Sequence, residues 1–227
     1  TEATPKPEGG INDEAYISAI KDGKYRTAQR MVDEAFGLQS PKTPLSDKQI
    51  SDIVSTLDHA TPRNESTRKY LRNEYAKELQ KNGIEYIDAY HVTDKELESF
   101  GKNGIKGSSL DYIGRSEGTL REPSVYLFLD PDDISTGYNG ITGAKNNISN
   151  IVHVRIPVSR IEDILWDSNF NVSFGTYSSV RMIGDIPSKW IKGQYKYAPP
   201  FILDENKKIV PLSRRILSRP NQSRPSE

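Results

Sequence analysis

Cysteine is absent from this chain, which has 227 residues and 0 Cys. The absence excludes disulfides, thiolate metal sites and cysteine nucleophiles together, and it leaves the redox compartment undecided. Only 3 His are present, so we expect no metal site and exclude a catalytic zinc built mainly on histidine. No apolar stretch is long enough to cross a bilayer, so we expect no membrane partner.

An excess of one charge is missing as well. The chain has 31 Lys+Arg against 31 Asp+Glu, with a pI near 6.8, so no general attraction to nucleic acid or acidic lipid is indicated. Hydrophobic residues make up 34% and the mean hydropathy is −0.68, which predicts polar flanks around a smaller packed core. The opening residues are neither a signal peptide nor an initiator sequence. We interpret the chain as part of a larger protein, located in the cytoplasm or delivered into a host or target cell.

The first third of the chain carries helical patterns. Apolar residues recur at steps of three and four over residues 13–36, with a break at Asp22-Gly23, which predicts a small helical hairpin. A third helix is predicted over 45–59, with Ser46 as its N-cap. A fourth helix begins at Thr61-Pro62, where threonine caps and proline takes the first helical position, and it ends at Asn82-Gly83.

Short strands dominate after residue 83. Apolar runs and alternating patterns predict strands over 84–92, 125–129, 151–158 and 178–186 and a last short pair within 201–210, with short helices only over 94–103 and 161–166. Helices first and short strands afterwards indicate an α+β fold. The predicted domains are an N-terminal helical and linker region (1–60), a strand-rich domain of mostly antiparallel strands (61–212) and a basic flexible tail (213–227).

Three stretches of the strand-rich part carry a family resemblance. They are Tyr90-His91-Val92-Thr93, Val125-Tyr126-Leu127-Phe128, and residues 173–190 with Gly184-Asp185-Ile186-Pro187 at their centre. Together they resemble ADP-ribosyltransferases of the diphtheria-toxin-like branch, which carry a His-Tyr-acid triad. The likeness is greatest to rifampin ADP-ribosyltransferases and to similar domains of phage polyvalent or polymorphic toxin proteins. It spans about residues 86–190 and implies an ADP-ribosyltransferase-like core.

The resemblance implies NAD as the substrate and assigns a role to each matched residue. His91 would hold the nicotinamide-side ribose, and Thr93 would support His91 or the same sugar. Tyr126 would stack on the cationic nicotinamide ring, which suits an electron-rich aromatic face. Asp167 matches the acidic position, so the implied catalytic set is His91, Tyr126 and Asp167.

Further residues would complete the nucleotide site. Gly104, in a loop with Gly101 and Gly107, would let the backbone approach the nucleotide. Arg121 is a candidate for a bidentate contact with the pyrophosphate, as are Arg115 and Arg181.

The reaction explains why a carboxylate belongs in this set. Nicotinamide leaves as a neutral group, while positive charge develops on the sugar, as in glycoside hydrolysis. A fixed carboxylate near that sugar stabilises the charge. Many members of the family use a glutamate, but no Glu lies between Glu162 and Glu205. The acid is therefore Asp167 or Asp185, or it is missing, in which case the fold binds NAD without transferring from it.

The leading functional prediction is NAD-dependent mono-ADP-ribosyl transfer, with release of nicotinamide, to an unidentified macromolecule or small molecule by an effector or toxin domain. One alternative is an RNA 2′-phosphotransferase-like enzyme, which would need basic residues along its cleft. Another is a non-catalytic NAD- or nucleotide-binding module, favoured if Asp167 points away from His91. A third is a virion interaction module, favoured if the Tyr126 face is simply packed.

Several residues also have a purely structural interpretation. His91 could be a buried histidine satisfied by the backbone, Tyr126 a core residue and Asp167 the start of a turn. Asp130, Asp132 and Asp133 lack the spacing and the closing glutamate of a calcium loop, so we interpret them as a solvated turn. His153 falls on the polar side of its strand and is expected to be exposed.

Overall fold

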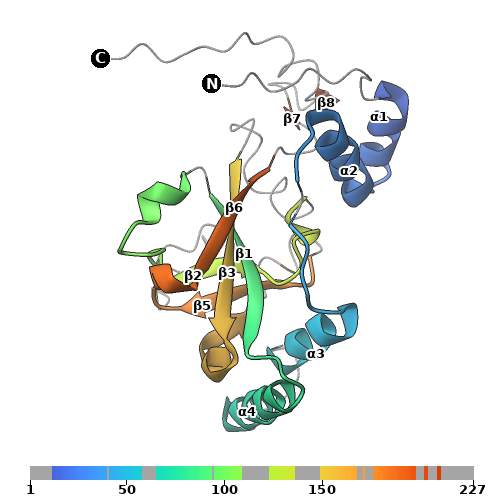
Figure 1. The fold of residues 1–227 in the computed structure, drawn as a ribbon. Helices are drawn as coiled ribbons and strands as arrows, with labels where there is room; N and C mark the ends of the chain where they lie inside the picture. Colours follow the sequence, from blue (N-terminus) through green and yellow to red (C-terminus); the bar gives the residue numbers. More distant parts are fainter. Residues whose placement is uncertain are drawn as a thin grey trace, which may run out of the picture.

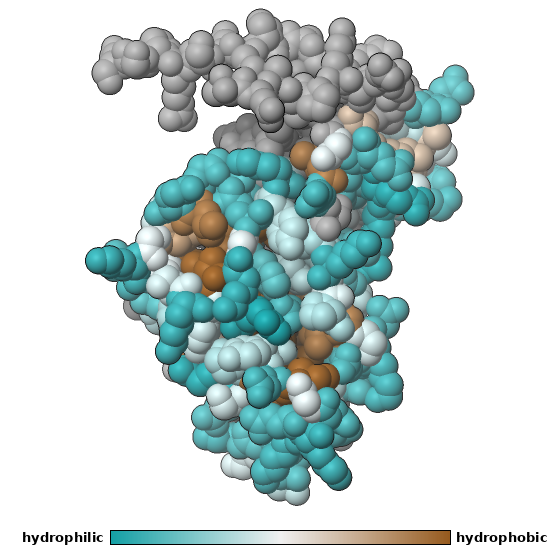
Figure 2. All heavy atoms as spheres, in the orientation of Figure 1, coloured by the Kyte–Doolittle hydropathy of each residue, from teal (hydrophilic) through white to brown (hydrophobic). Residues whose placement is uncertain are grey.

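The computed structural model describes residues 12–39, 41–57, 65–93, 95–108, 123–135, 149–167, 171, 176–197, 202–203 and 209–210. Within these residues four α-helices precede a six-stranded sheet (Figure 1), which confirms the α+β fold. In the same orientation the described surface is mostly hydrophilic, and the hydrophobic residues that show form small separate areas (Figure 2). None of the described helices is long and apolar enough to span a bilayer.

The first two helices form the predicted hairpin, α1 (Asp13–Lys21) and α2 (Tyr25–Phe36). The Asn12 side chain caps α1 by accepting a hydrogen bond from the Ala15 amide at 3.2 Å. Between the two helices lies a small apolar cluster of their own, made of Tyr16, Ala19, Ile20, Ala28 and Val32.

The next two helices, α3 (Asp47–Leu57) and α4 (Glu65–Lys81), pack against the sheet. Ser46 is the N-cap of α3, as predicted: its hydroxyl accepts from the Gln49 amide at 3.3 Å, and Gln49 Oε1 accepts from the Ser46 amide at 2.8 Å. Gly83 follows α4 with a φ of 76°, which confirms the predicted left-handed end. The predicted start at Thr61-Pro62 lies outside the described residues.

The apolar side chains of α3 share one core with the strands rather than with the hairpin. Ile50, Ile53 and Leu57 belong to the same buried cluster as Ile87 on the first strand, whereas the hairpin cluster is separate. Helix α3 therefore packs as part of the same unit as the sheet, and the predicted domain bounds stay a prediction. We call α3, α4 and the six-stranded sheet the sheet unit, and α1 with α2 the hairpin.

Six antiparallel strands build the sheet in the order β4-β5-β2-β1-β3-β6. They are β1 (Tyr86–Thr93), β2 (Ser124–Phe128), β3 (Ser149–Pro157), β4 (Ile164–Trp166), β5 (Ser179–Ile183) and β6 (Ile191–Tyr197). The predicted strands over 84–92, 125–129, 151–158 and 178–186 are thus confirmed as β1, β2, β3 and β5. A small separate sheet, β7 (Ile202–Leu203) with β8 (Ile209–Val210), matches the predicted last pair.

Short 3₁₀ segments connect several strands: η1 (Leu97–Phe100), η2 (Val158–Asp163) and η3 (Ser188–Trp190). The turn of helix predicted over 161–166 is confirmed only for its first half, because η2 ends at Asp163 and edge strand β4 follows it. Strand β6 was not predicted. It is the opposite edge strand, where an exposed side needs no apolar side chains, and Lys192, Gly193 and Lys196 hide its pattern.

The hydrogen-bonded ladder is broken between the two central strands. The pairing of β1 with β3 runs without interruption from Tyr86 to Thr93, but β1 meets β2 at one register position, Tyr90 opposite Phe128. Beyond that position, residues 91–93 of β1 do not pair with residues 124–126 of β2. We call this place the break. It leaves backbone groups at the centre of the sheet for other partners.

Candidate functional site

His91 lies on β1 at the break, with its ring directed across to β2. Its Nδ1 lies 2.9 Å from the Tyr126 carbonyl oxygen. A carbonyl can only accept, so Nδ1 carries the hydrogen and Nε2 carries the lone pair of a neutral ring. Among the described residues Nε2 has no hydrogen-bond partner. The arrangement fixes one tautomer and leaves an acceptor nitrogen for a ligand hydroxyl.

The surroundings of His91 keep its ring neutral. Burial has the largest effect and lowers the pKa of His91; the hydrogen bond to the Tyr126 carbonyl raises it by less, and the ammonium of Lys95, the smallest of the three effects, lowers it. Lys95 forms no ion pair with a described residue. The charge that acts on His91 is therefore a cation, and no carboxylate contributes to the shift.

Titration of His91 should show this lowered pKa. We expect its ring to titrate below the ordinary value of about 6.5, followed by the Cε1 proton in an NMR pH series. Because the folded-state pKa is lower than the unfolded-state pKa, protonation favours the unfolded chain. The contribution of His91 to stability should be complete above about pH 6.5 and should decrease as the pH falls below it. A midpoint above 6.5 would contradict the neutral ring.

The structure brings His91 to the backbone of Tyr126 and not to its ring. Leu127 belongs to the main core, so alternation along β2 turns Tyr126 to the opposite face. His91 lies two positions after Ala89, which belongs to the main core, so the His91 side chain lies on the main-core face of β1. Half-buried Tyr126 instead lies opposite Arg181 of β5, one of the arginines considered for the pyrophosphate.

The Thr93 side chain hydrogen-bonds the backbone of the residues that follow β1, next to the break. Its hydroxyl accepts a hydrogen bond from the Lys95 amide at 3.2 Å. Thr93 lies two positions after His91 along β1, so both side chains lie on one side of the strand. Thr93 thus orients the segment that carries the Lys95 ammonium, and no contact between Thr93 and His91 is observed.

Asp167 is not brought to His91. It follows β4 at the edge of the sheet, with β5 and β2 between β4 and β1. At about 4.8 Å per strand, β4 and β1 are about 14 Å apart. The Asp167 carboxylate is buried and lies 3.4 Å from Ser179 Oγ, while its amide donates to the Ser179 carbonyl. The convergence of His91, Tyr126 and Asp167 that the resemblance implies is absent from this arrangement.

Asp185, the other predicted acid, is a turn residue on the surface. Its carboxylate accepts from Lys106 Nζ at 2.7 Å and from the Gly107 amide at 2.9 Å. These two hydrogen bonds hold the pKa of Asp185 below its usual value. Asp185 therefore holds residues 106 and 107 against the turn that follows β5. The predicted phosphate ligands Arg115 and Arg121 lie outside the described residues.

Gly104 serves the packing of this segment. Its φ is +66°, and a Cβ atom there would lie 1.9 Å from the carbonyl oxygen of Ile186. Ile105 and Ile186 form an isolated bridge beside it. The close approach that glycine permits at position 104 is thus to the backbone of Ile186, and the predicted approach to a nucleotide stays a prediction.

Replacing Gly104 with alanine should destabilise the protein strongly. The left-handed backbone costs an alanine about 1–2 kcal/mol, and the clash with Ile186 adds to this, so we expect a loss of at least about 2 kcal/mol in urea denaturation. Gly193→Ala is the matched control, because its Cβ would meet nothing within 4 Å and its φ is ordinary. Equal stability of the two variants would contradict the packing role.

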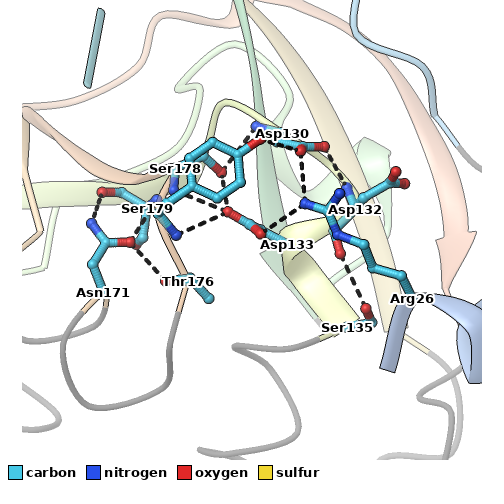
Figure 3. Close-up of polar contacts among 10 residues, drawn as sticks. Arg26, Asp130, Asp132, Asp133, Ser135, Asn171, Thr176, Ser178 and Ser179 are labelled. Carbon is cyan, nitrogen blue, oxygen red and sulfur yellow. Dashed lines mark hydrogen bonds and ion pairs between the residues drawn. The ribbon is translucent and has the colours of Figure 1, made fainter. Parts of the chain in front are cut away.

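The largest polar network in the described residues is one that the sequence interpretation missed (Figure 3). Asp130 and Asp133, interpreted as a solvated turn, are only 6% and 4% exposed, and Asp132 alone faces solvent. Asp133 Oδ2 accepts from the Ser178 amide at 3.0 Å, from Ser178 Oγ at 2.7 Å and from the Tyr177 amide at 3.2 Å. We call Asp130 and Asp133 the acid pair.

An arginine of the hairpin forms ion pairs with both members of the acid pair. Arg26 Nη2 lies 3.0 Å from Asp130 Oδ2 and 3.1 Å from Asp133 Oδ1. Burial alone would lower the pKa of Arg26, but the charge of Asp130 and hydrogen bonds to Asp133 and Tyr177 raise it well above its ordinary value. The Tyr177 hydroxyl also donates to Asp130 at 2.7 Å. No local sequence pattern announces the network, because Arg26 precedes Asp130 by 104 residues.

His153 is another correction, since it is not simply exposed. Its ring stacks on Tyr90 with centroids 5.2 Å apart, and its Nε2 bonds Asp88, which is 3% exposed. Arg155 lies 3.4 Å from the same carboxylate oxygen. This cluster is a structural network of a histidine, a carboxylate and a guanidinium between β1 and β3. No group of three potential metal ligands occurs anywhere in the described part of the chain.

Comparisons with known proteins identify no family for this chain. No family model and no curated protein match the chain. Among solved structures it is similar to a chain named EcPltA, at 9% sequence identity and a TM-score of 0.34, over 56% of this chain and 82% of that chain. Similarity at this level is weak and does not assign the chain to a family.

Proposed function

We propose that this chain is an NAD-binding domain of the ADP-ribosyltransferase-like kind, with His91 holding the nicotinamide-side ribose. The single observation that carries the proposal is the neutral His91 ring, fixed through Nδ1 at the break with Nε2 left as an acceptor. A ribose hydroxyl is a fitting donor to that nitrogen. The resemblance around Tyr90 to Thr93 and Val125 to Phe128 supports the same ligand.

Binding without transfer is the form of this function that the geometry favours. Transfer needs a carboxylate beside the sugar, but Asp167 bonds Ser179 and Asp185 bonds Lys106. The cation of Lys95, and no carboxylate, acts on His91. Mono-ADP-ribosyl transfer by an effector or toxin domain is the second candidate, supported by the same histidine geometry. It requires a carboxylate that reaches the sugar.

Calorimetric titration with NAD, together with chromatography for free nicotinamide, separates the two candidates. We expect saturable binding of NAD and no nicotinamide beyond that of a protein-free control. Release of nicotinamide with turnover would replace the binding proposal by the transferase. Absence of binding would remove both.

Lys95 is the cation that we expect to meet the pyrophosphate of NAD. It lies near His91, is exposed and forms no ion pair with any described residue. Lys95→Ala should weaken NAD binding about threefold at low salt, because an exposed charge pair contributes little, and the loss should shrink as salt is added. Affinity for nicotinamide riboside, which has no pyrophosphate, should not change. Lys102→Ala, an exposed lysine farther along the same loop, is the control and should bind NAD as the wild type does.

A further inference from the structure

The hairpin is a separate packing unit. Its apolar cluster has five buried residues, and none of them belongs to the main core. None belongs either to the cluster around Tyr90 and Phe128 on the other face of the sheet. Figure 1 shows α1 and α2 together above the sheet, at the opposite end of the molecule from α3 and α4. Moving the hairpin away from the sheet would therefore break none of the contacts that define these apolar clusters.

The ion pairs between hairpin and sheet unit converge on one guanidinium. Both described ion pairs use Nη2 of Arg26, whose side chain is 49% exposed, while the two carboxylates are almost fully buried. The sheet unit itself holds those carboxylates. Ser178, which directly precedes β5, donates to Asp133 (Figure 3), and Tyr177 donates to Asp130. The acid pair is thus held in place by the sheet unit itself, and the positive charge that pairs with it belongs to Arg26 of the hairpin.

The contact around this ion pair is hollow. A cavity of about 570 Å³ lies between α2 and the sheet unit, with Arg30 on one side and Asp132, Ser135 and Tyr197 on the other. A hollow interface with a polar rim gains less from apolar burial than a close-packed one. Charge therefore has a larger share in holding the hairpin than it has in holding the core.

We infer that the hairpin is an electrostatic latch: it closes over the 130–135 turn when Arg26 occupies the acid pair, and it swings away when that contact is lost. The connection from α2 to α3 has no helix or strand in its described residues, 38–39 and 41–46, and the Tyr90 hydroxyl donates to the Lys42 carbonyl at 3.0 Å, so the hairpin turns about the part of this tether that precedes Lys42. This inference does not depend on NAD binding. It predicts an open state whose population rises with ionic strength, because the occupant is half-exposed.

Spin labels can measure the latch directly, because the chain has no cysteine of its own. Labels on Glu14→Cys in α1 and Asn73→Cys in α4 occupy exposed positions in the two units. With Arg26 present at low salt we expect one narrow inter-label distance in pulsed dipolar spectroscopy. Arg26→Ala should broaden it and extend it to longer distances, and 1 M salt should partly do the same to the parent protein.

Arg30→Ala is the matched control, because Arg30 lines the same cavity and forms no ion pair with a described residue. It should leave the distance narrow. A narrow distance in Arg26→Ala, or equal broadening in Arg30→Ala, would overturn the latch. Arg26→Gln provides a second variant without the charge. In each variant, the NMR amide resonances of the sheet unit should match those of the parent protein. A match shows that a broadened inter-label distance reports opening of the hairpin and not unfolding of the chain.

Discussion

Asp133→Ala should lower the free energy of unfolding by about 3 kcal/mol or more. Removing this carboxylate leaves the Ser178 amide and hydroxyl without their acceptor at a residue that is 0% exposed. It also leaves Arg26 with half of its counter-charge. Losing one partner of a buried, hydrogen-bonded ionic group typically costs about 3–5 kcal/mol. Urea denaturation followed by far-ultraviolet circular dichroism measures the change.

Asp132→Ala is the control for that experiment, since Asp132 is the exposed neighbour in the same turn. It should change the unfolding free energy by less than about 0.5 kcal/mol. If Asp133→Ala cost no more than Asp132→Ala, the acid pair would be a solvated turn after all and the network of Figure 3 would not stabilise the fold.

His91→Ala should weaken NAD binding about tenfold, which corresponds to about 1.4 kcal/mol and to one hydrogen bond from a ribose hydroxyl to Nε2. Calorimetric titration measures the loss. His153→Ala is a useful comparison, because His153 is bound to Asp88 on the other face of β1. It is expected to reduce stability while leaving the NAD affinity of the folded fraction unchanged. An unchanged affinity in His91→Ala would remove the histidine from the site.

Elements with a strong local signal were predictable from the sequence. The runs that became β1 and β2 are apolar because both strands lie inside the sheet, and the alternation of β3 follows from its two unlike faces. Strand β6 escaped because an edge strand tolerates lysines and a glycine. Its position, like that of β4, depends on pairing partners that local periodicity does not encode.

Site residues were less predictable, because their roles depend on long-range pairing. Asp167 satisfied the motif pattern, yet strand order places β4 at the edge and so separates it from His91. Asp130 and Asp133 looked like surface residues because Arg26, their counter-charge, is remote in the sequence. The sequence pattern placed His91 near the end of a strand, but the break between β1 and β2 beside it appears only in the register.

The separation of Asp167 from His91 changes the activity that we expect from the resemblance to ADP-ribosyltransferases. A domain that keeps the ribose-holding histidine without a carboxylate acting on it would recognise NAD and leave the glycosidic bond intact. Affinity for NAD should then be insensitive to Asp167→Asn, since that side chain bonds Ser179 and not the ligand.

The most direct measurement is the nitrogen-15 resonance of His91 Nε2, recorded by a long-range proton–nitrogen correlation during titration with NAD. The ring should show an unprotonated Nε2 at pH 7.5 before any ligand is added, as the bond from Nδ1 to Tyr126 requires. Saturating NAD should shift Nε2 upfield, as expected when a hydroxyl begins to donate to it, while Nδ1 moves little. An Nε2 resonance that NAD leaves unmoved, in a chain that either binds NAD elsewhere or does not bind it, would contradict the proposed site.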